Sequence, residues 1–202
     1  MFDMKAEISI PIRSAEGIRQ VIVRYPTDSE FLEWRRKKKI LQNDLGRDSY
    51  EIVPSKPEAC DLALVKLIQS DEAPITEEAE AYYILDRLFK TDISSRPERE
   101  GSGYTIRMKV MQKVKTSHTL RLPSVKETMD YERQRPPLTL KKFGQQEIRL
   151  NYSAAGELYD KLKQFSEGYQ GDTPVLHKQE VINVLLQQIR SDEEPGDSDD
   201  QD

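Results

Sequence analysis

The chain repeats its own pattern, and this repeat constrains the fold more than any other feature of the sequence. Leu120 stands 97 positions after Val23, and the segments Val23–Glu30 and Leu120–Glu127 read alike: an apolar residue, Arg, any residue, Pro, Thr or Ser, two further residues and Glu. Matched residue classes continue on both sides with small changes in spacing. Internal repeats indicate one structural unit used more than once. We therefore predict a tandem duplication, with one unit at residues 1–92 and the second at residues 104–192.

Residues 93–103 and the end of the chain differ in composition from the two units. Residues 93–103 are polar and contain one proline and two glycines, which favours a linker or a wide turn. Residues 191–202 hold seven Asp or Glu and no Lys or Arg, so without them the formal net charge changes from −5 to +2. A segment this acidic, with no apolar side chain, does not fold alone. We predict a disordered acidic tail at residues 193–202, which either solvates the protein or binds a partner.

Each predicted unit begins with the alternation that is typical of half-buried strands. Apolar side chains occupy every second position of Ile8–Ile12 and of Ile106–Val110, and a second strand is expected at Gln20–Tyr25 and at His118–Leu122. Each pair of strands predicts an antiparallel β-hairpin. The second strand of each pair stops at a proline, which cannot donate to a strand ladder.

Three helices are expected after each hairpin. Thr27 with Glu30, and Ser124 with Glu127, match the pattern in which a hydroxyl and a carboxylate cap the start of a helix. Helices are expected at 28–40, from Ser55 onward and at 76–89 in the first unit, and at 125–135, from Ser153 onward and at 177–190 in the second. Short strands are expected at 50–53 and 147–151. The fold class is therefore α+β, a duplicated unit in which a β-hairpin or small sheet is covered by about three helices.

Residue types that carry chemistry are scarce. Cys60 is the only cysteine, which prevents an internal disulfide and fits a reducing, cytoplasmic location. It corresponds to the apolar Leu158 of the second repeat, so we interpret it as a buried side chain rather than a nucleophile. His118 and His177 have no second ligand at the spacing that zinc sites use, so no metal site is expected.

The sequence gives no support to an enzyme class. Gly101–Gly103 lacks the third glycine and the following helix of a phosphate-binding loop, and no nucleophile, base and orienting group stand at matching places. We therefore expect a protein that is not an enzyme and needs no cofactor. No apolar run has the length of a membrane span, and the first residues lack the apolar core of a signal peptide, so no membrane partner is expected.

Two groups of basic residues are the candidate partner-binding sites. Arg24 and Arg121 stand at the same place in both repeats, where the arginine forms either a structural ion pair or part of a shared docking surface. The second group is the basic run of the first expected helix, composed of Arg35, Arg36, Lys37, Lys38 and Lys39. Such a run is either a solvated helix end, where cations are favoured, or a site for nucleic-acid phosphates. Nucleic acid is the less favoured partner, because the run lacks aromatic side chains for base stacking apart from Trp34, which we expect to pack inward.

The segments Val23–Glu30 and Leu120–Glu127 resemble the entry to the helical part of tail assembly chaperones from tailed phages and prophages. Leu45–Arg47 and Ala154–Tyr159 also look like parts of prophage structural-module proteins. The resemblance implies a small non-catalytic protein that binds tape-measure or tail-tube subunits before they polymerise. We therefore expect a cytoplasmic assembly factor that binds a tail structural subunit. The alternatives are a structural component of the virion, such as a neck or tail-completion protein, and a nucleic-acid-binding module that uses Arg35–Lys39.

Overall fold

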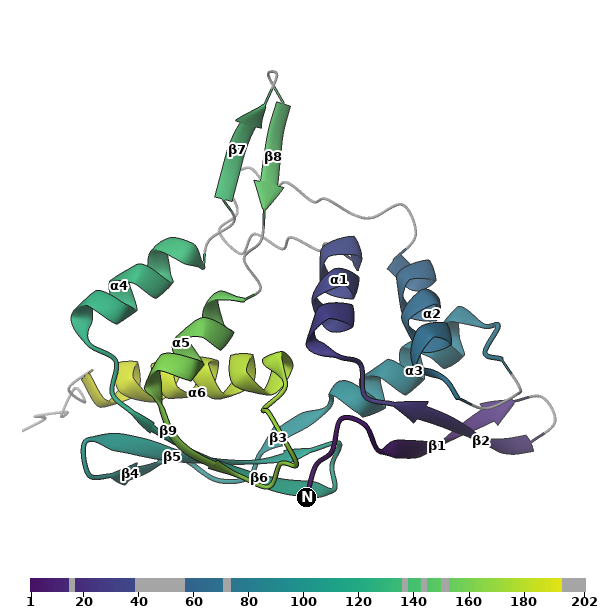
Figure 1. Ribbon diagram of the computed structural model, residues 1–202, viewed down its shortest axis with the longest axis horizontal. Coiled ribbons are helices and arrows are strands. Elements are labelled where there is room, and N and C mark those ends of the chain that lie inside the picture. Colours follow the sequence, from purple (N-terminus) through teal and green to yellow (C-terminus); the bar gives the residue numbers. More distant parts are fainter. Residues whose placement is uncertain are drawn as a thin grey trace, which may run out of the picture. The chain divides into compact units, whose positions relative to one another are not determined.

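The computed structural model of this chain divides into two compact units (Figure 1). It describes residues 1–14, 17–38, 57–70, 74–135, 138–142, 145–149 and 153–193. The first unit comprises Met1–Lys90 together with the short segments Val110–Val114 and Tyr169–Pro174. The second unit comprises the remaining residues. Helices and antiparallel strands make up both, so the predicted α+β class is confirmed.

The first unit combines one hairpin with three helices. Strands β1 (Glu7–Ser14) and β2 (Gly17–Arg24) pair antiparallel from Glu7 opposite Arg24 to Ser14 opposite Gly17. The helices are α1 (Asp28–Lys38), α2 (Pro57–Ile68) and α3 (Glu78–Phe89). Alternate side chains of the hairpin meet α2 and α3 in the core, because period-two and period-3.6 patterns both present apolar residues on one side. The buried apolar side chains include Ile10, Ile12, Val21, Val23, Leu64, Val65, Ile68, Ala81, Ile84, Leu85 and Leu88.

An aromatic cluster joins the end of the hairpin to the helices of the first unit. The ring of Phe89 lies 5.9 Å from that of Tyr25, 5.4 Å from that of Phe31 and 5.2 Å from that of Trp34, measured between centroids. Edge-to-face and tilted pairs of this kind contribute about 0.5–1.5 kcal/mol each beyond their buried area. The cluster therefore fixes α1 relative to β2 and α3, and Trp34 packs inward as expected.

The second unit is built on a larger sheet. Strands β3 (Thr91–Ile93), β5 (Gly103–Val110), β6 (Val114–Arg121) and β9 (Lys163–Glu167) lie in that order, and β4 (Glu98–Glu100) also pairs with β5. Helices α4 (Val125–Gln134), α5 (Ala154–Leu162) and α6 (Val175–Glu193) complete the unit, with α5 and α6 packed over the sheet (Figure 1). A separate hairpin consists of β7 (Leu138–Lys142) and β8 (Gln145–Arg149).

Each unit has a hairpin that three helices follow along the chain, but in the second unit β7, β8 and β9 lie between these helices. In each unit the residues after the second helix return to the second hairpin strand, since Val23 pairs with Gln69 and Leu120 pairs with Lys163, both antiparallel. The duplication itself stays a prediction.

Several segments differ from the expectation. Residues 93–103 do not form a simple linker, because they contain β4, which pairs with β5, and the first residue of β5. The charged side chains of β4 made this stretch look like a linker, but charges are also usual on edge strands, which they protect from further pairing. Strands β7 and β9 were not expected, and the strand expected at 147–151 is β8. The strand expected at 50–53 lies outside the described residues.

The acidic end of the chain begins later than expected. Helix α6 continues to Glu193, three residues beyond the expected end of the helix at residue 190, so the first residue of the predicted tail, Glu193, is helical. Asp192 is held there because its carboxylate accepts hydrogen bonds from the Tyr104 hydroxyl and, at 2.6 Å, from the Gln188 amide. Residues 194–202 lie outside the described part of the chain.

Candidate functional site

The two repeated arginines make the same ion pair in each unit. The Arg24 guanidinium donates to both carboxylate oxygens of Glu30 at 2.7 and 2.8 Å. The Arg121 guanidinium donates to both oxygens of Glu127 at 2.6 and 2.8 Å. Each arginine also donates to the carbonyl oxygen of the residue that follows it, at 3.2 and 3.0 Å. Two-pronged pairs of this geometry are the stronger kind of ion pair.

Each of these glutamates also caps a helix. The Glu30 carboxylate accepts from the Thr27 backbone N–H at 2.8 Å, and the Thr27 hydroxyl accepts from the Glu30 backbone N–H at 3.3 Å. Ser124 and Glu127 form the same capping box at 2.8 and 3.3 Å. The hydrogen bond from Arg24 is the main cause that lowers the pKa of Glu30 to about 2, and Arg121 holds the pKa of Glu127 well below its ordinary value. Each arginine therefore links the end of a strand to the first turn of the following helix. A docking role for Arg24 and Arg121 stays a prediction.

Replacing Glu30 by Gln is expected to reduce the free energy of unfolding by about 1 kcal/mol, because the amide still caps the helix but the ion pair is lost. Since the folded pKa of Glu30 is depressed, the wild-type advantage is present above pH 4.5 and disappears as the pH falls toward 2. Urea unfolding followed by circular dichroism at several pH values measures this difference in the free energy of unfolding. Glu33→Gln is the control and should change stability little, since the ion pair of Glu33 with Lys37 lies on the exposed surface. Equal effects of the two substitutions would contradict the role given to Arg24.

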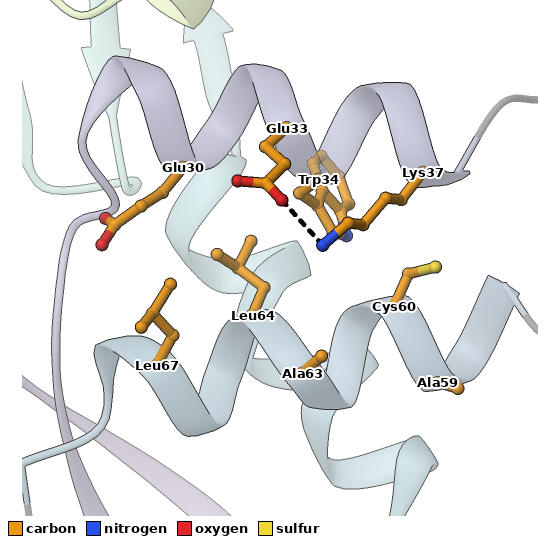
Figure 2. A pocket seen from close by; sticks show the side chains of 9 residues that line it. All are labelled: Glu30, Glu33, Trp34, Lys37, Ala59, Cys60, Ala63, Leu64 and Leu67. Atoms are coloured by element: carbon orange, nitrogen blue, oxygen red, sulfur yellow. Dashed lines mark ion pairs between the residues drawn. The ribbon is translucent and has the colours of Figure 1, made fainter.

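A groove of about 250 Å³ lies between α1 and α2 of the first unit (Figure 2). Its lining residues are Glu30, Glu33, Trp34, Lys37, Ala59, Cys60, Ala63, Leu64 and Leu67. Carboxylates and an ammonium group from α1 form one rim, whereas α2 contributes apolar side chains and a thiol (Figure 2). The groove is thus apolar on the α2 side and charged along α1.

The exposed apolar surface of the groove comes mainly from Leu67, whose side chain is 58% exposed, whereas Leu64 beside it is buried. The floor is held in place by Trp34, whose indole N–H donates to Asp61 on α2 at 2.8 Å. Cys60 is half-buried and lines the groove, which corrects the interpretation of this residue as a core side chain. Cys60, Leu64 and Leu67 share one face of α2 by their spacing, but spacing alone does not indicate which of them stay uncovered.

The basic run of α1 reaches one end of this groove. Arg35, Arg36 and Lys37 are exposed, and the Lys37 ammonium lies 2.8 Å from the Glu33 carboxylate. Lys38 is the last residue of α1, but its side chain and all of Lys39 lie outside the described residues. Of the candidate residues, the structure therefore brings Lys37 to the groove, and it brings Glu30, the partner of Arg24, to the other end (Figure 2).

The second unit contains a buried pair of histidines. His118 on β6 is fully buried, and its Nδ1 lies 2.8 Å from the hydroxyl of the buried Tyr159. His177 on α6 is 1% exposed. Burial lowers the pKa of His118 to about 4 and the pKa of His177 to about 3, so both imidazoles are neutral near pH 7.

Within the described ranges, no group of three or more His, Cys, Asp or Glu side chains could hold a metal ion. Nor does any helix in this part of the chain combine the length and apolar character needed to cross a membrane. Comparison of the chain with protein-family models, curated proteins and solved structures finds no match. The groove between α1 and α2 is therefore the candidate site on physical grounds alone.

Proposed function

We propose that the chain is a non-enzymatic protein-interaction factor that binds an apolar segment of a structural subunit through the groove between α1 and α2. The observation that carries the proposal is the exposed Leu67 on an apolar floor formed with Ala63 and Leu64. Protein interfaces combine an apolar core with a polar rim, and the apolar floor and charged α1 side of this groove have that arrangement.

The size of the groove favours a protein partner over a small molecule. Small-molecule sites usually have about 300–1,000 Å³ and enclose most of the ligand, with a few convergent polar groups. The groove has about 250 Å³ and lies open between two helices, and its carboxylate Glu30 is already bound by Arg24. A few apolar side chains of a protein segment fit this space.

The resemblance of Val23–Glu30 and Leu120–Glu127 to tail assembly chaperones suggests the class of partner. We infer a role in phage or prophage tail assembly, in which the protein holds a tail-tube or tape-measure subunit in the cytoplasm before polymerisation. Binding of this kind needs a surface that covers apolar segments of the subunit, and it does not need a catalytic group.

Leu67→Glu tests the proposal. Coexpression of the protein with the tail-tube or tape-measure subunit of its own phage should give a soluble complex, and the substitution should reduce the recovered complex at least about tenfold, because it places a charge in the apolar contact. Ile18→Glu is the matched control, since Ile18 is also an exposed apolar side chain of the first unit and does not line the groove. Circular dichroism checks that both variants are folded. A complex that survives Leu67→Glu unchanged, or no complex with either subunit, would refute the proposal.

A further inference from the structure

We propose that the occupant of the groove is an amphipathic helix of the partner that carries carboxylates at the end beside Lys37. This inference rests on the proposed function and specifies the chemistry of its partner. It follows from the spacing of the apolar side chains on α2 and from the distribution of charge along α1.

The apolar side chains of α2 favour a helix as occupant. Ala59, Ala63 and Leu67 are spaced four residues apart, so they form one row along α2, and all three line the groove (Figure 2). The two alanines allow a second backbone to approach closely, and Leu67 supplies the larger contact. Side chains at positions i and i+4 of a partner helix can interdigitate with such a row.

The charges around the groove favour a partner segment of negative charge. Glu30 is neutralised by Arg24 and Glu33 by Lys37, so the α1 rim has no excess of negative charge. At the Lys37 end, the described part of α1 carries the exposed cations Arg35, Arg36 and Lys37. Against them, the described parts of α1 and α2 place the exposed carboxylates of Glu33 and Glu58 at this end. The balance is positive, which complements an acidic segment.

The ion pair at the rim can be exchanged for one with a partner. Lys37 and Glu33 have side chains that are 64% and 61% exposed, and exposed pairs of this type contribute little to stability. A carboxylate of the partner can therefore replace Glu33 at Lys37 at small cost. The acidic end of this chain is a poor alternative occupant, because residues 194–202 contain no apolar side chain to cover Leu67.

The single tryptophan of the chain makes the test direct, because Trp34 lines the groove. The full-length protein is titrated with three helical peptides that contain no tryptophan. The first has a leucine and alanine face and glutamates at one end. The second replaces these glutamates with lysines, and the third keeps the glutamates but replaces the apolar face with serine and glutamine. Alkylation of Cys60, the only thiol, provides an independent measure of occupancy.

The first peptide should shift Trp34 emission saturably and slow alkylation of Cys60, and at low salt the second should bind about tenfold more weakly. The double variant Arg36→Glu with Lys37→Glu should reverse this preference. Lys66→Glu is the matched control, because Lys66 is an exposed cation of α2 outside the groove lining, and it should leave the preference as it is.

Three outcomes would overturn the inference. Equal binding of the first and second peptides would show an apolar site without charge selection. Equal binding of the third peptide, or of single-stranded DNA, would show a polyanion surface. No response of Trp34 to any peptide would show that the groove does not bind a helix of this chemistry. In the last case, loss of the subunit complex in Leu67→Glu would still support the proposed function.

Discussion

Lowering the pH from 7 to 5 is expected to destabilise the second unit by about 4 kcal/mol, because it contains two buried neutral histidines. An unfolded histidine has a pKa near 6.5, whereas the folded values are about 4 for His118 and about 3 for His177. The unfolded chain therefore takes up more protons in this interval than the folded unit does. At pH 5 this costs about 2 kcal/mol for each histidine.

Stability falls with falling pH because both folded histidine pKa values are lower than the unfolded value. The histidines do not oppose folding above pH 6.5, and the penalty grows as the pH falls from there toward the folded pKa values. Lys163 acts in the same direction on His118, because its ammonium group lies 6.0 Å from the ring centroid of Tyr159, the partner of His118, and opposes a further positive charge. Carboxylates such as Glu30 contribute only below pH 4.5, so the interval from 7 to 5 isolates the imidazoles.

Urea unfolding followed by circular dichroism at pH 7, 6 and 5 measures this dependence. His118→Gln and His177→Gln should each remove about half of the pH dependence, whatever their effect on stability at pH 7. The double variant removes every imidazole of the chain and should show almost none. A pH dependence that persists in the double variant would assign the effect to other groups.

Gly103→Ala is expected to reduce the free energy of unfolding by about 3 kcal/mol, because β5 and β6 approach each other too closely there for a side chain. A Cβ atom at Gly103 would overlap the carbonyl oxygen of Leu120 and would lie 2.9 Å from its carbonyl carbon and 3.0 Å from the Cα of Arg121. All three atoms are backbone, so relief requires one strand to move away from the other.

Gly101→Ala is the matched control for this prediction. Gly101 has a φ of +56°, but a Cβ there would meet nothing within 4 Å, so the substitution costs only the strain of a left-handed alanine, about 1 kcal/mol. Thermal or urea unfolding of the two variants separates the effect of the close contact from the effect of backbone strain. Similar losses at both positions would show that backbone conformation, and not the contact with Leu120, sets the requirement for glycine.

The sequence predicted the elements whose signals are local. The capping residues Thr27 and Ser124 located the starts of α1 and α4, and alternation located both hairpins. Strands β4 and β9 escaped prediction because short polar strands are formed by their neighbours rather than by their own propensity.

The candidate site was harder to foresee, because exposure depends on what covers a side chain. Leu67 and Phe165 are both large apolar residues, yet each is 58% exposed in the structure. Arg24 and Arg121 were predictable as ion pairs because their glutamates follow six residues later in both repeats. The groove arises only when α1 and α2 pack together, so no single segment of the sequence indicates it.

The membership of Val110–Val114 and Tyr169–Pro174 in the first unit has a consequence for how the protein is made. Phe2 packs its ring 5.9 Å from that of Tyr169 and accepts a backbone hydrogen bond from Gln170 at 2.7 Å, and Lys90 accepts one from Met111 at 2.8 Å. A ribosome delivers these partners only after most of the second unit has emerged. The first unit therefore cannot complete its folding until residue 174 has been synthesised. A fragment that stops at residue 92 lacks part of the core of this unit.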